Sequence, residues 1–171
     1  MTRIGAVSPP QEPADIFCGP THNPWSTTMA TAPVANTAYL YKFRVGAPIK
    51  VSRVMITTGV ATDHVDVGIY NLQGVRLAST GDTALVGSPA QQTINLTAAV
   101  TLAPGLYWAA IAINGTTGRV YGVSTLSAHN AVLRDNGYST AVANSFVLPN
   151  PIIPGATSTA GFGCAAIWFL A

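Results

Sequence analysis

The chain has 171 residues, of which 49% are apolar and only 8% are charged, and its formal net charge is +2. Disordered chains are poor in apolar residues and rich in charge, so this composition argues against disorder for the body of the chain. The dense basic stripe with interleaved aromatic residues that is typical of nucleic-acid binding is also missing. Because so few charges leave a nearly neutral surface, the composition predicts that other protein chains normally cover much of it.

The N-terminal part of the chain, residues 1–36, contains six of the twelve prolines. Proline cannot donate a hydrogen bond to a sheet ladder and interrupts helices, so we expect an extended N-terminal arm. The arm contains three large apolar residues, Ile16, Phe17 and Trp25. We expect these side chains to act in assembly, at least partly against another chain, because the entropy lost in ordering an extended segment must be offset by burial.

Residues 37–171 have a different pattern, in which short β-branched and aromatic runs are separated by turn residues. The run "HVDVGIY" (64–70) alternates clearly, as does "QQTINL" (91–96), and "NLQG" (71–74) resembles a hairpin turn. This pattern predicts an all-β domain, an antiparallel β-sandwich that is jelly-roll-like. Its alternation assigns ten side chains to the core: Tyr41, Phe43, Val54, Ile56, Val65, Val67, Ile69, Ile94, Leu96 and Ile111.

The expected strand at 106–113 is apolar on both faces, which a strand with one wet face would not be. One face carries Trp108 and two alanines, and the other carries Tyr107 and two isoleucines. The final run, "GCAAIWFLA", is also apolar on both faces. Three coverings stay open for the second face: the arm, a long weakly patterned excursion at 125–162, or a neighbouring subunit, which the low charge favours.

Few residues offer catalytic or metal-binding chemistry. His64 and Asp66 share one strand face, but no third ligand lies at a useful spacing, and a solvated strand start is the commoner explanation. Cys18 and His22 lie on the arm rather than on a rigid scaffold. Cys18 and Cys164 could pair or stay free. We therefore expect no catalytic, cofactor-binding or metal site, no cofactor and no enzyme activity.

Four aromatic residues are candidates for a ligand-binding or interface surface: Tyr70, Trp108, Tyr121 and Tyr138. Their rings could stack on the faces of sugars, as in a lectin-like sandwich. Such rings also fill cores and subunit contacts, and this is their more frequent use. An exposed row of Tyr70, Tyr121 and Tyr138 would favour glycan binding.

Two stretches resemble a pattern of β-sandwich domains in tailed-bacteriophage virion proteins, of the minor tail, tail-tip and head-decoration types. The matching features are Gly68-Ile69-Tyr70-Asn71, the turn glycine Gly74, and Leu102-x-Pro104-Gly105-x-Tyr107-Trp108. The resemblance covers residues 37–124. It implies a structural or adhesive role in a symmetric assembly and brings no site residues with it.

The resemblance and the composition together predict a non-enzymatic structural component of a phage virion, a minor tail or tail-tip protein that assembles through its arm and its apolar sheet face. A capsid decoration protein and a carbohydrate-binding or receptor-adhesion module are the alternatives. The expected partners are copies of itself, other virion proteins and a host-surface glycan, with no nucleic acid. We expect synthesis in the host cytoplasm without a signal peptide, and no membrane insertion, because the final apolar run is too short to span a bilayer.

Overall fold

A computed structural model of the chain describes residues 16–18, 34–123, 139–154, 164–165 and 167–171, and these residues form an all-β fold. No helix occurs in this part of the chain, so it offers none that is long and apolar enough to cross a membrane. The strands are β1 (Ile16–Cys18), β2 (Thr37–Val45), β3 (Ile49–Val60), β4 (His64–Tyr70), β5 (Arg76–Ser79), β6 (Thr83–Ala84), β7 (Ala90–Leu102), β8 (Gly105–Ile113), β9 (Arg119–Val120), β10 (Gly122–Val123), β11 (Ser139–Val142), β12 (Cys164–Ala165) and β13 (Ile167–Leu170).

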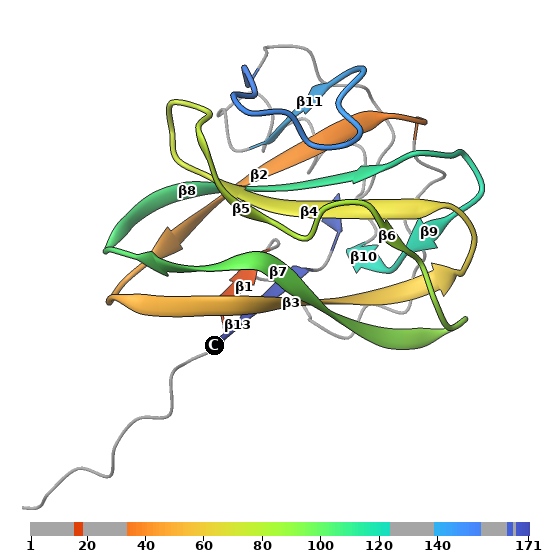
Figure 1. Ribbon diagram of the computed structural model, residues 1–171, viewed down its shortest axis with the longest axis horizontal. Helices are drawn as coiled ribbons and strands as arrows, with labels where there is room; N and C mark the ends of the chain where they lie inside the picture. The colour runs from red at the N-terminus through yellow and green to blue at the C-terminus, as the bar shows by residue number, and fades with distance from the viewer. Residues whose placement is uncertain (1–15, 19–33, 124–138, 155–163, 166) are drawn as a thin grey trace, which may run out of the picture.

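Two antiparallel sheets pack face to face as a β-sandwich (Figure 1). The first, which we call the β8 sheet, has the order β11-β2-β8-β4-β5, with β6 beside β4. The second, the β3 sheet, has the order β1-β13-β3-β7, with β9 also paired to β3. Strands β10 and β12 form a separate two-stranded ladder. The predicted antiparallel sandwich is therefore confirmed.

Two neighbouring connections, from β2 to β3 and from β7 to β8, join the two sheets at the same edge of the sandwich. Strand β2 continues into β3, and β7 continues into β8, so each pair leaves one sheet and enters the other. The pairing persists across the corner, since Val45 lies opposite Gly105 on one side and Ile49 opposite Leu102 on the other. This folding of a long strand pair over itself is the jelly-roll feature of the domain.

The main core lies between the two sheets and is made by alternate residues of their strands. All ten side chains that the alternation assigned to the core are buried. Phe43 belongs to this core, with its ring centroid 5.4 Å from that of Phe169 and 5.8 Å from that of Tyr107. The inward residues of β8, including Ala109 and Ile111, belong to the same core.

The opposite, outward face of the β8 sheet is also apolar and is lined at its centre by small residues. Here Gly68 of β4 leaves room for a neighbour, because a Cβ built on it would lie 3.0 Å from Cδ1 of Leu148. Across β2, β8 and β4 the facing rows are Lys42–Trp108–Tyr70, Leu40–Ala110–Gly68 and Ala38–Ala112–Asp66.

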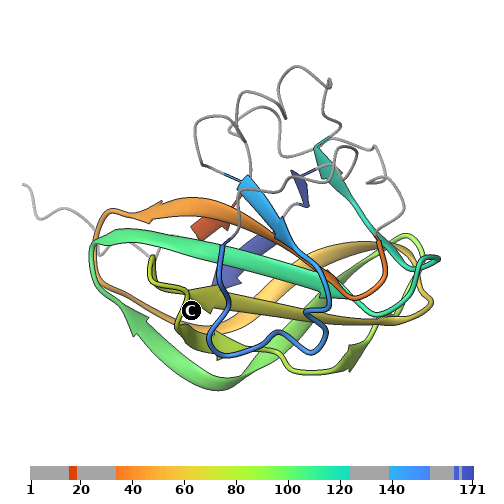
Figure 2. The ribbon, with the colours of Figure 1, turned by 90° about the horizontal axis from the view of Figure 1, so that it is seen from above.

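Residues 143–154, which we call the cover segment, follow β11 and run across this outward face (Figure 2). Leu148 and Ile152 of the segment are each 1% exposed and pack with Trp108 and Ala110 in a second core. The covering of the second face of 106–113 thus comes from the excursion at 125–162. The chain itself therefore occupies the outward face of β8, where the low charge favoured a neighbouring subunit. Assembly through an apolar sheet face stays a prediction.

The N-terminal arm contributes one strand to the sandwich. Strand β1 pairs antiparallel with β13, with Ile16 opposite Phe169 and Cys18 opposite Ile167. The backbone of this part of the arm is therefore fixed to its own domain, while Trp25 and Tyr138 lie outside the described residues. In β13, Ile167 and Phe169 are buried and the alternate residues are half-buried, so only one face of this strand is closed.

The second core gives a direct test of the cover segment. Leu148→Ala removes buried methyl groups between the segment and the β8 sheet, and we expect the free energy of unfolding to fall by about 2–5 kcal/mol. Its neighbour Val147 is 44% exposed, and Val147→Ala should change the stability by no more than about 0.5 kcal/mol. Urea denaturation of both variants measures the difference. Equal effects at the two positions would show that the segment does not pack as described.

Candidate functional site

His64 and Asp66, the first candidate pair, lie in different surroundings although they share a strand face. Nδ1 of His64 lies 2.5 Å from Oδ1 of Asp82, and both side chains are about half exposed, at 47% and 53%. His64 therefore fits a solvated strand start. Asp66 is fully buried under the cover segment, so the same explanation is wrong for it.

The Asp66 carboxylate joins three parts of the chain. Its Oδ2 accepts a hydrogen bond from the Leu148 N–H at 3.0 Å. Its Oδ1 accepts from the Gly81 N–H at 3.0 Å and from the Thr80 hydroxyl at 3.2 Å. Burial raises the pKa of Asp66 above its ordinary value of 3.8, although these hydrogen bonds and the positive charge of Arg76 act in the opposite direction. Asp66 thus ties β4 to the cover segment and to the turn after β5.

Other polar groups hold the cover segment along its length. The Tyr70 hydroxyl donates to the Pro149 carbonyl at 2.7 Å, and burial raises the pKa of this tyrosine. The Arg76 guanidinium donates to the Leu148 carbonyl. The Arg76 N–H donates to Oδ1 of Asn150 at 2.9 Å. The first two bonds satisfy carbonyl groups of the irregular segment that would otherwise lack a partner, so they allow it to lie over an apolar surface.

The end of the cover segment is fixed to the β4–β5 turn at Gly74. The Ile152 N–H donates to the Gly74 carbonyl at 2.9 Å. Gly74 has φ +80°, and a Cβ on it would lie 1.8 Å from the Ile152 carbonyl oxygen. Only glycine therefore permits both this turn and this contact.

The four candidate aromatic residues do not form an exposed row. Tyr70 is fully buried and Trp108 is 6% exposed, because the cover segment packs on both. These two candidates for a ligand-binding or interface surface thus belong to the second core. Tyr121 is half-buried, and its N–H donates to the Thr57 carbonyl at 2.7 Å. Tyr138 lies outside the described residues.

Trp108 has a buried polar atom, the indole Nε1, that lacks a hydrogen-bond partner among the described residues. The Lys42 ammonium lies 4.8 Å from the centroid of the indole ring, a cation–π contact across β2 and β8. The indole thus stabilises the sheet through its ring and through burial rather than through its N–H.

Asp63 closes the turn that follows β8. It has φ +67°, and its Oδ2 accepts hydrogen bonds from the N–H groups of Thr117 at 3.0 Å and Gly118 at 2.6 Å. Within the described residues, each of the carboxylates Asp63, Asp66 and Asp82 therefore has a partner in the chain. The same residues contain no group of three or more histidine, cysteine or acidic side chains that could hold a metal ion.

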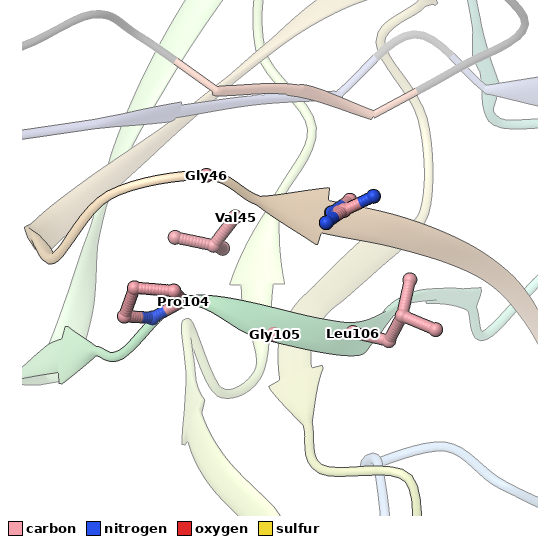
Figure 3. A pocket seen from close by; sticks show the side chains of 6 residues that line it. Val45, Gly46, Pro104, Gly105 and Leu106 are labelled. Carbon is pink, nitrogen blue, oxygen red and sulfur yellow. The ribbon is translucent and has the colours of Figure 1, made fainter.

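A shallow pocket of about 450 Å³ lies at the corner where β2 ends and β8 begins (Figure 3). Its wall combines one guanidinium with apolar side chains and glycine backbone: Arg44, Val45, Gly46, Pro104, Gly105 and Leu106. These groups can contact an apolar or anionic group. They include no nucleophile, general base or metal ligand.

Comparison with protein-family models, with curated proteins and with solved structures finds no match for this chain.

Asp66→Asn tests whether the carboxylate fixes the cover segment. The asparagine amide offers one oxygen and one donor nitrogen, so either the Leu148 N–H or the Gly81 N–H loses its acceptor. We expect the free energy of unfolding to fall by about 1–3 kcal/mol. Asp82→Asn is the matched control on an exposed carboxylate, and its effect should be smaller. Urea denaturation at neutral pH compares them, and an unchanged D66N stability would contradict the role assigned to Asp66.

The raised pKa of Asp66 also predicts a pH dependence. A carboxyl group that binds its proton more tightly in the folded state contributes stability at low pH, and this contribution is lost as the pH rises through the folded-state pKa. The stability of the wild type relative to D66N should therefore increase as the pH falls from about 7 toward about 4. Paired urea titrations at several pH values measure this difference. A difference that decreases on acidification would show that hydrogen bonding to the ionised form outweighs burial.

Proposed function

We propose that this chain is a non-enzymatic structural component of a phage virion, of the minor tail or tail-tip type. The observation that carries the proposal is the use of polar groups inside the chain. The described carboxylates and the buried Tyr70 hydroxyl bind the chain to itself, and Asp66 and Tyr70 converge on the cover segment rather than on an open pocket. Such an arrangement suits a structural protein, in which polar side chains stabilise the fold rather than take part in a reaction.

Association is supported by the apolar side chains that the cover segment and the β4–β5 turn leave exposed. The two are joined by the hydrogen bond between Ile152 and Gly74. Ile153, next along the segment, is 80% exposed. The other exposed members are Leu72 at 43%, Val75 at 44% and Val147 at 44%. Exposed apolar side chains that gather on neighbouring segments are typical of contacts with other proteins.

A capsid decoration protein remains the nearest alternative, because the same fold and surface suit either location. The glycan-binding module receives less support. Tyr70 and Trp108 are covered by the chain itself, so they offer no face for a sugar ring.

The proposal is tested on particles from the source culture. Antibodies raised against the purified chain should detect it in density-banded particles, and immunogold labelling should place it on the tail. Labelling of the head would support decoration instead. Absence of the chain from banded particles, with the protein present in the unassembled fraction, would contradict a virion role.

The arm provides a variant for the same measurement. Trp25→Ala changes an arm residue assigned to assembly and leaves every described strand in the chain, so we expect an unchanged melting temperature. We also expect the variant to band with particles much less than the unsubstituted chain when both are supplied in equal amounts, because Trp25 is assigned to assembly. Full incorporation of the variant would show that Trp25 has no role in assembly.

A further inference from the structure

Strand β7 forms one border of the β3 sheet. It has 13 residues, Ala90–Leu102, and pairs with β3 along one side. Within the described residues no strand pairs with its other side, and it follows the rim of the molecule (Figure 2). The other border strands are short: β1 has 3 residues, and β5 and β11 have 4 each. An edge strand of this length exposes unpaired backbone N–H and C=O groups, which are ready to pair with another strand.

The free part of this edge is confined to residues 90–95. Pro89 precedes it, and the register with β3 shifts beyond Asn95, where Thr97 turns its hydroxyl to the Ser79 carbonyl of β5 at 2.9 Å. Proteins protect edge strands with charges, prolines or bulges. The bulge protects residues 96–99, whereas "AQQTIN" (90–95) has neither charge nor proline.

One face of this stretch is exposed and the other is buried, and this difference fixes the register in which a partner strand can pair with it. Gln91, Thr93 and Asn95 are exposed, while Gln92 and Ile94 are buried. A strand that extends the sheet must place its own exposed residues opposite these, since a shift of one residue would bring buried positions to the surface. The partner strand therefore needs exposed polar residues in alternation with buried residues.

We propose that a second copy of this chain pairs with residues 91–95 in antiparallel orientation and joins the two β3 sheets into one continuous sheet. The stretch is self-complementary, because amide and hydroxyl side chains both donate and accept hydrogen bonds. A two-fold axis at Thr93 places this residue opposite the same residue of the second copy, and it places Gln91 opposite the second copy's Asn95. The same surface serves both copies, as closed dimers require.

This pairing concerns copies of the chain alone and does not depend on a virion, so its test can fail while the proposed function stands. Thr93→Lys puts like charges opposite each other at the axis and is an exposed change that the fold should tolerate. Thr116→Lys is the matched control: Thr116 is exposed on the turn before β9, and β9 lies on the other side of β3 from β7.

Sedimentation equilibrium of the full chain, from about 1 μM to about 1 mM, measures the dimer. We expect a reversible dimer for the wild type and T116K, and clearly weaker association for T93K with an unchanged melting temperature. A wild type that stays monomeric throughout, or a T93K chain that dimerises as the wild type does, would overturn the proposal. If T93K melts at a lower temperature, the cysteine variant below decides.

Thr93→Cys tests the register. Opposite residues of an antiparallel pair bring their Cβ atoms to about 4.5–5.5 Å, within reach of a short thiol cross-linker. Peptide mapping should find a link that joins the substituted position of one chain to the same position of another, at a yield well above that of the corresponding link in a Thr116→Cys control. The unsubstituted chain shows the background from Cys18 and Cys164. A cross-link no stronger than that of the control would rule out this two-fold axis.

Discussion

The N–H of Leu148 donates a hydrogen bond to the buried carboxylate of Asp66, 82 residues earlier in the chain. This bond brings an irregular segment onto a sheet face that would otherwise be apolar and open to water. The small residues of that face follow from the same requirement, since Gly68 and Ala110 leave room for Leu148 and Ile152. The burial of Tyr70 and Trp108 follows as well. Without the cover segment, each of these residues would be hard to explain.

Much of the sandwich could be predicted because strand alternation is a local property. Val65, Val67 and Ile69 alternate within a few positions, and the face that they occupy follows directly from the period of two. The apolar character of both faces of β8 also showed correctly that a second layer exists. The alternation shows which side chains of a strand face the core, and this depends only on neighbouring residues in the sequence.

The identity of the second layer could not be predicted in the same way. The cover segment has no periodicity, and Pro149 and Pro151 prevent it from reading as a strand or a helix. Asp66 lies between two valines of an alternating strand, so its place on the outward face was predicted as exposed to solvent. A signal was present: the same face continues through Gly68 and Tyr70, which already indicates a covered surface. Reading a charged residue together with its neighbours on one face would have favoured a buried, hydrogen-bonded carboxylate.

The two packed layers give a second explanation for the low content of charged residues. A domain with two stacked apolar interfaces, one between the sheets and one beneath the cover segment, buries more of its chain than a simple sandwich and so needs fewer charged residues. The chain's own packing therefore explains part of the low content of charged residues, and this part is no evidence for partner proteins. The proposed association is supported instead by features that stay exposed after both layers have packed: Ile153 and its exposed apolar neighbours, and the uncharged edge of β7. These are separate surfaces on one small domain, and a subunit that contacts its neighbours through more than one surface can be built into an extended assembly as well as a closed pair.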